Sequence, residues 1–261
     1  MLAIHFKHSP GLVAYITCGD PDLDISRDVA LAAIDAGADV IELGVPFSDP
    51  VADGPVIQRA SERALKHGTT LAGVLETAKQ IRSQSDAGLI IFSYFNPILQ
   101  LGLEKFCASA CEAGVDGTLV TDLPIEEASE YLKVMKSHKL APIFLAAPTS
   151  TDERLRQIAK HSRGFVYAIS RTGITGARQE LASDARSLVA RLRSFTKLPI
   201  AVGFGVSTPE QFAEVGGFAD AAVVGSAIVQ RIEQNRGNEA AAVAKFLSFL
   251  TAAAQHADAT S

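Results

Sequence analysis

Two acids, Glu42 and Asp53, flank a segment rich in proline and glycine and are the residues best suited to proton-transfer chemistry. In the strand predicted around the first acid, Glu42 faces away from its neighbours Ile41 and Leu43, because side chains alternate along a strand. A carboxylate enclosed in protein loses hydration, so its pKa should rise toward the range useful for proton transfer. The alternative is a structural glutamate satisfied by an arginine or by backbone N–H groups. The acidic loop that follows the strand end favours the catalytic interpretation.

Two glycine-containing loops follow the last two predicted strands and have the chemistry of a phosphate site. They are Gly203–Ser207 and Gly225–Ser226, and the second leads into a predicted helix over Ala227–Ile232. Glycine lets the main chain approach an anion, Ser226 adds a hydroxyl donor, and a helix N-terminus attracts negative charge. The alternative is that the glycines only form tight turns and that Ser226 is a helix N-cap. Two such loops where barrels often bind phosphate favour the anion site.

The segment Ser170–Arg178 and the aromatic residue Tyr167 are further candidates. Two glycines bracket small polar residues in Ser170–Arg178, a composition equally typical of a mobile lid and of an ordinary exposed loop. Tyr167 should point inward in the same register as Phe165 and Ile169. Its phenol could meet Glu42 there. On these residues alone, a packed aromatic side chain with a satisfied hydroxyl is the better interpretation of Tyr167.

The positions of the histidines and lysines narrow the chemistry. None of the six histidines ends a predicted strand, which argues against a histidine base and a histidine-rich metal site. Lys139 and Lys197 precede predicted strands and should lie at the opposite rim from an active site. A Schiff base and covalently held pyridoxal phosphate are therefore disfavoured. What remains is acid–base catalysis by carboxylates on a phosphorylated small molecule, without a metal or a cofactor.

Short apolar or β-branched runs alternate with amphipathic segments such as Leu23–Ala36 and Leu71–Ile81, a pattern typical of a parallel sheet with helical crossovers. The pattern favours an α/β fold of the (β/α)8 TIM-barrel type with extra short helices. An open doubly wound sheet is the rival. Its dinucleotide form needs Gly-x-Gly-x-x-Gly near the start, whereas the near match at Gly203 comes late and lacks the third glycine. The eight predicted strands are Leu12–Thr17, Asp39–Leu43, Leu89–Ser93, Gly117–Val120, Ala141–Ala146, Gly164–Ser170, Pro199–Val202 and Ala221–Val224.

We predict a single domain over residues 1–261, a length typical of one such barrel. Residues 1–11 form a short N-terminal segment, a C-terminal helix covers about 239–256, and the tail 257–261 is predicted to be disordered. A weak internal repeat supports the strand count, because three similar segments end a helix with glycine and lead through aspartate into a strand. They are Ala36–Asp39, Ala113–Asp116 and Gly217–Asp220.

Composition and charge exclude several classes of protein. The net charge of −5 and the pI near 5.7 argue against a nucleic-acid partner. No apolar run reaches the roughly 18 residues of a membrane span, and Met1–Pro10 lacks the features of a secretory signal. We therefore expect a cytoplasmic protein. Cys107 and Cys111 are expected to pack as small apolar side chains on one helix face, not to form disulfides.

Four motifs together resemble one enzyme family: YITCGDP at Tyr15–Pro21, ELGVPFSDPVADGP at Glu42–Pro55, TDLP at Thr121–Pro124 and SRTGITG at Ser170–Gly176. From Leu12 to about Glu233, the chain resembles the alpha subunit of tryptophan synthase. The resemblance implies a (β/α)8 barrel that cleaves indole-3-glycerol phosphate to indole and glyceraldehyde 3-phosphate by a retro-aldol reaction without a cofactor.

Other functions stay open at this point. A phosphosugar isomerase and indole-glycerol-phosphate synthase have similar barrels. The synthase, however, needs a lysine at the carboxyl end of a strand, and this sequence has none at the predicted strand ends. A non-catalytic regulatory subunit is an alternative of another class. Its weakness is that a buried acid without a function would only destabilise the fold.

The resemblance assigns roles to individual residues. Glu42 is the proton-transferring group, and Asp53 accepts a hydrogen bond from the indole N–H and stabilises positive charge there. Tyr167 matches a position near the acid–base glutamate, which reverses the packed-aromatic interpretation. Thr175 matches a lid residue that hydrogen-bonds to Asp53 on closure, and Tyr15 lines the indole pocket. The phosphate group is assigned to Gly176, Gly205, Gly225 and Ser226.

The resemblance also implies a partner. The family works as an α2β2 complex in which indole passes through a tunnel to a beta subunit that carries pyridoxal phosphate. One departure concerns residues 1–11, which are too few for the usual N-terminal helix that covers the bottom of the barrel, and this puts stability in doubt. The residues that match positions near the subunit interface are Pro46, Asp49, Pro50 and Asn96.

Overall fold

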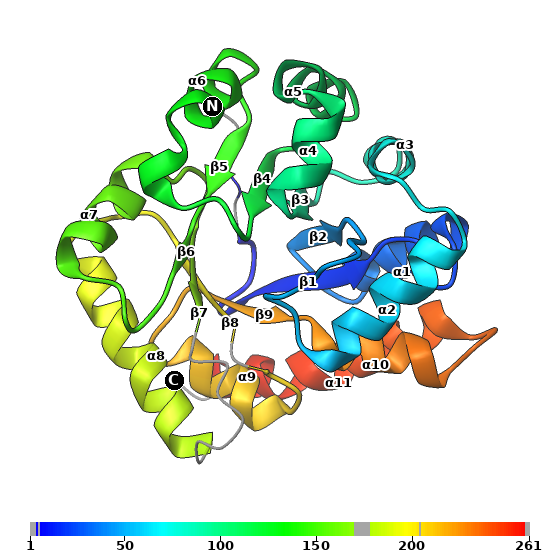
Figure 1. Ribbon diagram of the computed structural model, residues 1–261. Coiled ribbons are helices and arrows are strands. Elements are labelled where there is room, and N and C mark those ends of the chain that lie inside the picture. Colours follow the sequence, from blue (N-terminus) through cyan, green and yellow to red (C-terminus); the bar gives the residue numbers. More distant parts are fainter. Residues whose placement is uncertain (1–3, 5, 170–177, 204, 259–261) are drawn as a thin grey trace.

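The computed structural model describes residues 4, 6–169, 178–203 and 205–258, and a parallel sheet surrounded by helices forms its centre (Figure 1). The strand order is β5-β4-β3-β2-β1-β9-β8-β7-β6. Only Phe144 separates β5 (Ala141–Ile143) from β6 (Leu145–Ala146), so the two ends of the sheet meet in one interrupted strand and the barrel closes. This confirms the predicted (β/α)8 TIM barrel. The predicted fifth strand is divided at Phe144, whose carbonyl accepts a hydrogen bond from the Tyr167 N–H (3.2 Å).

All the strand pairings are parallel, so the carboxyl ends of the strands lie at one end of the barrel. The remaining strands are β1 (Gly11–Thr17), β2 (Val40–Gly44), β3 (Gly88–Ser93), β4 (Gly117–Val120), β7 (Val166–Ile169), β8 (Ile200–Gly203) and β9 (Ala221–Val224).

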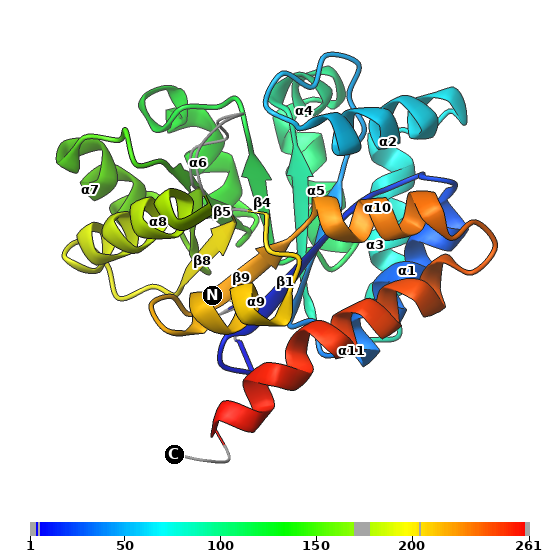
Figure 2. The ribbon, with the colours of Figure 1, turned by 90° about the horizontal axis from the view of Figure 1, so that it is seen from below.

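Helices cover the outside of the barrel, and two helices instead of one follow both β2 and β3. The last helix packs against α1, α9 and α10 (Figure 2). The helices are α1 (Leu23–Asp35), α2 (Pro55–Lys66), α3 (Leu71–Arg82), α4 (Phe95–Leu101), α5 (Leu103–Glu112), the 3-10 helix η1 (Ile125–Glu127), α6 (Ser129–Ser137), α7 (Asp152–His161), α8 (Arg178–Arg193), α9 (Pro209–Gly216), α10 (Ser226–Gln234) and α11 (Glu239–Asp258).

Side chains alternate between two apolar layers along the strands. Ile41 and Leu43 belong to the larger layer, between the sheet and the helices. Val40 belongs to a smaller layer inside the barrel, together with Phe165 and, partly buried, Tyr167. The alternation predicted for β2 is therefore confirmed. This alternation directs the side chain of Glu42, between Ile41 and Leu43, into the barrel.

The three glycine-to-aspartate repeats fasten the amino-terminal end of the barrel. Each aspartate lies just before a strand, and one of its carboxylate oxygens accepts a hydrogen bond from a backbone N–H at the start of the neighbouring strand. This explains why the repeat recurs, since the first amides of those strands would otherwise lack a partner. The pairs are Asp39 with Leu12 (3.0 Å), Asp116 with Leu89 (2.9 Å) and Asp220 with Ile200 (2.7 Å).

Ile4 and Phe6, which precede β1, lie in the amino-terminal mouth of the barrel. Ile4 is buried within the interior layer, and the ring of Phe6 packs on that of Phe165 with 5.9 Å between centroids. Gly11 and Gly164 leave the necessary space, because a Cβ atom there would collide with Phe6 and Ile4 respectively. Two apolar side chains, Ile4 and Phe6, thus cover the bottom of the barrel.

Other details differ from the sequence predictions. Cys107 is buried but Cys111 is exposed, because the buried stripe of α5 runs through Phe106, Cys107 and Ala110 and leaves Cys111 outside it. The last helix continues to Asp258, past the predicted start of the tail, and residues 259–261 lie outside the described chain. No helix in the described ranges is long and apolar enough to cross a membrane.

Candidate active site

Glu42 lies inside the barrel, where its backbone pairs with Tyr15 of β1 and Ile90 of β3. Its side chain has no exposed surface, and within the described part of the chain neither carboxylate oxygen has a hydrogen-bond partner. Burial raises the pKa of Glu42 from 4.5 to about 8. The alternative of a structural, ion-paired glutamate does not match this environment. A carboxyl group that keeps its proton near neutral pH can serve as an acid and then as a base.

Two tyrosines lie close to this acid. Tyr15 is buried, with its hydroxyl 3.3 Å from Thr17 Oγ1. Burial raises the pKa of Tyr15 and of Tyr167 well above 10, and the charge of Glu42 raises the pKa of Tyr167 further, as expected for neighbouring groups. Among the described atoms no hydrogen bond joins Glu42 to either phenol. The interior of the barrel therefore holds one carboxyl and two hydroxyl groups.

Two glycines make room for these phenols. A Cβ atom at Gly44 would collide with the hydroxyl of Tyr15, and one at Gly203 would collide with the hydroxyl of Tyr167. Gly225 also lies against Tyr15, since a Cβ atom there would be 3.5 Å from the Cβ of Tyr15. Gly44 and Gly203, at the carboxyl ends of β2 and β8, thus leave space inside the barrel for tyrosines that come from other strands.

Asp53 lies in the loop between β2 and α2 and is partly buried. Burial raises its pKa to about 6, and a hydrogen bond from the Tyr94 hydroxyl to Asp53 Oδ2 (3.2 Å) opposes that rise. The same hydroxyl accepts a hydrogen bond from the Ala52 N–H (2.9 Å), and the Tyr94 ring stacks on Phe47 (4.9 Å). Tyr94 therefore fixes the second acid. Sequence reasoning missed Tyr94, although it directly follows β3.

The two glycine loops lie at the carboxyl ends of β8 and β9. Gly205 has φ +82°, a conformation that favours glycine. Ser226 is the first residue of α10 and Gly225 is the N-cap, so the alternative of Ser226 as N-cap is wrong. Glycine at the cap brings the first amides of α10 to the site without a side chain in the way. Two further predicted residues, Thr175 and Gly176, lie outside the described residues.

The residues predicted for a subunit interface follow β2 and β3. Asp49 and Asn96 are exposed and Pro50 is partly exposed, whereas Pro46 is buried and lies beneath this surface. Val51, which follows Pro50, is 88 % exposed. The end of the barrel that holds Glu42 and Asp53 thus carries an exposed loop with both polar and apolar groups.

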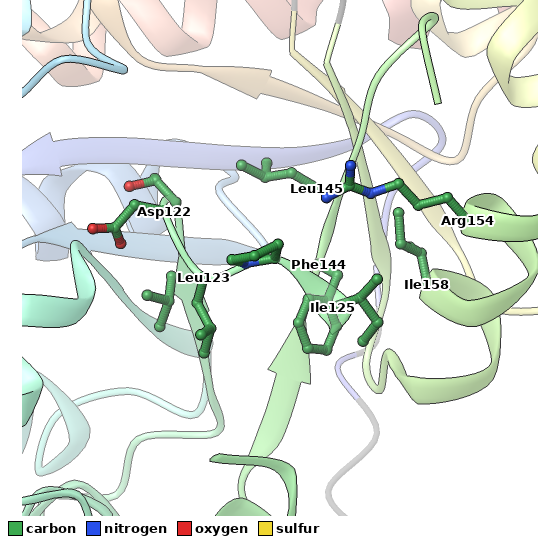
Figure 3. Close-up of a pocket in the computed structure, with 10 residues that line it drawn as sticks. Asp122, Leu123, Ile125, Phe144, Leu145, Arg154 and Ile158 are labelled. Atoms are coloured by element: carbon green, nitrogen blue, oxygen red, sulfur yellow. The ribbon is translucent and has the colours of Figure 1, made fainter. Parts of the chain in front are cut away.

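A cavity of about 340 Å³ lies between the end of β4, the interruption of the β5–β6 strand and α7 (Figure 3). The TDLP motif lines one side of it, and Phe144, Leu145 and Arg154 line the other. Asp122 of the motif accepts a hydrogen bond from the Phe95 N–H (2.7 Å). The motif therefore shapes the rim next to α4 and does not contribute a group beside Glu42.

The fold and the site define a class: a (β/α)8-barrel enzyme with a buried, unpaired carboxyl group inside the described barrel and glycine-containing loops after β8 and β9. Comparison with known proteins gives the family. The model of the tryptophan synthase alpha chain family matches residues 2–260, and the chain belongs to that family.

Individual relatives agree with this result. The tryptophan synthase alpha chain of Solibacter usitatus is 53 % identical over 229 residues, which cover 88 % of this chain and 86 % of the relative. That of Geobacter sulfurreducens is 48 % identical and covers 94 % of both chains. The crystal structure of tryptophan synthase subunit alpha from Legionella pneumophila has a TM-score of 0.87 at 37 % identity, covering 95 % of this chain and 93 % of that chain.

Structures of tryptophan synthase from Mycobacterium tuberculosis are also similar. The ligand-free form has a TM-score of 0.86 at 34 % identity and covers 95 % of this chain and 94 % of that chain. The resemblance read from the four motifs is therefore confirmed, and so is the predicted activity class. The chain is a lyase of tryptophan biosynthesis, whose family cleaves indole-3-glycerol phosphate to indole and glyceraldehyde 3-phosphate.

Proposed function

We propose that Glu42 carries out the proton transfers of indole-3-glycerol phosphate cleavage in this protein. Cleavage requires a proton at indole C3 and removal of a proton from a glycerol hydroxyl, and one carboxyl group beside both atoms can serve as acid and then as base. The observation that carries the proposal is the burial of Glu42 without a described partner, which raises its pKa to about 8.

Asp53 is the second catalytic acid in this proposal. As a carboxylate it accepts a hydrogen bond from the indole N–H and stabilises the positive charge that develops when C3 is protonated. Its pKa of about 6 leaves it mostly ionised at neutral pH. Tyr167 contacts the reacting end of the substrate near Glu42, and Tyr15 forms a wall of the indole pocket beside Phe92, 5.1 Å away between ring centroids.

The phosphate group binds at the glycine loops. Gly205 and Gly225 let the backbone approach the phosphate oxygens. Ser226, at the start of α10, donates hydrogen bonds to them from its hydroxyl and its backbone N–H. Thr175 and Gly176 complete this set on the basis of the family motif alone. The two ends of the substrate differ in chemistry and bind to different groups, which orients it with the indole ring toward Asp53 and the phosphate group toward α10.

We also propose a beta-subunit partner in an α2β2 complex, to which indole passes. The exposed residues Asp49, Pro50 and Asn96, with Pro46 beneath them, provide its docking surface. Pyridoxal phosphate belongs to that partner, and this chain needs no cofactor because carboxyl groups supply its proton transfers. The cytoplasm is the proposed location, in keeping with the free thiols of the three cysteines.

The test is the release of indole from indole-3-glycerol phosphate by purified protein, before and after dialysis against a chelator. The wild-type protein should release indole in both cases, and Glu42→Gln should lower the rate by at least about 100-fold. Glu76→Gln, on the exposed side of α3, is the matched control. Equal rates for the Glu42 variant and the wild type would remove Glu42 from the mechanism. A wild-type protein without turnover would support the non-catalytic alternative.

A further inference from the structure

A cluster of charged side chains joins the β1–α1 loop, α2 and the carboxyl end of α10. Asp20 is buried, and its carboxylate accepts two hydrogen bonds from Arg63 (2.9 and 2.7 Å) and one from Arg236 (2.9 Å). Arg63 also donates to Glu233 (2.7 Å), which accepts two further bonds from Arg59 (3.1 and 2.9 Å). We call these five residues the α2 clamp, because Arg59 and Arg63 lie on α2 and hold it to the other two elements.

The clamp joins two helices whose amino-terminal ends carry the proposed site. Helix α2 starts directly after Asp53, and α10 starts at the loop Gly225–Ser226. The helices lie side by side (Figure 1). Glu233 is at the far end of α10 and Arg63 is one turn from the end of α2. The pair therefore links the two helices well away from the reacting atoms.

Helix α2 is also hydrogen-bonded to the loop that precedes it. Gln58 donates a hydrogen bond to the Asp53 carbonyl (2.9 Å), which ties the loop to the first turns of the helix. Ala60, with Val56 and Ile57 beside it, packs against Tyr15 and Val229 of α10. A shift of α2 would move Asp53 together with the apolar side chains that pack against Tyr15, because the helix and the loop are joined.

We propose that Arg63 is a positioning residue that sets the distance between Asp53 and the phosphate loop Gly225–Ser226. The inference rests on the proposed function, since it concerns a substrate that spans both places. Arg63 suits the role because its planar fork binds Asp20 with two nitrogens and leaves the third for Glu233. Loss of the fork leaves the buried carboxylate of Asp20 with Arg236 as its remaining described partner, and it leaves Arg59 as the described side-chain link between α2 and Glu233 of α10.

The test compares Arg63→Gln with Arg82→Gln. Arg82 is a matched control, since it also donates all three guanidinium nitrogens, one of them to Asp116 (2.7 Å), but at the opposite end of the barrel. The exposed fractions of the two arginine side chains are also similar, 26 % and 24 %. Both variants should lose stability. Arg63→Gln alone should lower kcat/KM for indole release by at least about tenfold, because small misplacements of catalytic groups have effects of this size.

Two further readouts separate positioning from a structural role. Inhibition by inorganic phosphate, which uses the phosphate loop alone, should change by less than about twofold in Arg63→Gln. Backbone hydrogen exchange over residues 50–58 should accelerate in that variant and stay as in the wild type in Arg82→Gln. If Arg63→Gln does not fold, Glu233→Gln weakens the links of Arg59 and Arg63 to α10 and leaves the bonds of Arg63 to Asp20 in place. It should produce the same changes in the same direction.

The results separate the two proposals. If kcat/KM and the exchange rates of Arg63→Gln, or of Glu233→Gln in its place, match those of Arg82→Gln, the clamp has no positioning role. If the wild-type protein releases no indole, the proposed function fails. Hydrogen exchange over residues 50–58 still decides then whether the clamp holds the Asp53 loop.

Discussion

Replacing Glu42 by glutamine should make the protein more stable at alkaline pH while it removes activity. The folded-state pKa of Glu42 is raised from 4.5 to about 8 by burial. Ionisation is therefore harder in the folded than in the unfolded chain. The stability that goes with the protonated carboxyl is fully present below about pH 4.5 and is lost as the pH rises through 8. Because one pKa unit corresponds to about 1.4 kcal/mol, the whole effect is about 5 kcal/mol.

Urea unfolding at a series of pH values measures this effect. The free energy of unfolding of Glu42→Gln minus that of the wild type should be near zero at pH 4 and should rise to several kcal/mol at pH 9. Glu76→Gln, on the exposed side of α3, should show no such rise. A difference that does not change with pH would refute the reasoning, because it would show that Glu42 ionises as easily in the folded protein as in the unfolded chain.

Three other predictions follow from the structure. Tyr94→Phe removes a hydrogen bond that lowers the pKa of Asp53, so the acid limb of the pH–rate profile for indole release should move to higher pH; an unmoved limb would contradict the assignment to Asp53. Ile4→Ala should lower the free energy of unfolding by about 2 to 4 kcal/mol in urea titrations without changing kcat, since it empties a buried position far from the site. Gly203→Ala should displace the phenol of Tyr167 and reduce kcat; unchanged kinetics would show that this phenol is not needed at its position.

The barrel and its first acid could be predicted because they depend on local patterns. The alternation around Glu42 requires only that β2 be buried on both faces, and both faces are indeed buried. The aspartates of the three repeats were visible as a pattern. Their function as partners for the amides of neighbouring strands needed the strand order, since each pair joins residues that are at least 20 positions apart.

What the sequence did not predict depends on contacts between distant segments. Tyr94 was overlooked because its partner Asp53 lies 41 positions earlier. The α2 clamp joins Asp20 to Arg236, which are 216 positions apart. The sequence prediction for the segment before β1 considered only its length. In the structure, two of its apolar side chains, Ile4 and Phe6, pack in the bottom of the barrel beside glycines. Such contacts are set by the closed barrel and have no signal in local periodicity.

The most direct test of the central claim is the pH dependence of kcat/KM for indole release from indole-3-glycerol phosphate. In the proposed mechanism Asp53 is ionised and Glu42 is protonated at the start, so the profile should be bell-shaped, falling below about pH 6 and above about pH 8. Glu42→Gln should lower the rate at every pH and abolish the alkaline limb. A wild-type rate that stays constant from pH 7 to well above pH 9, or a Glu42→Gln variant that keeps the alkaline limb, would contradict the account.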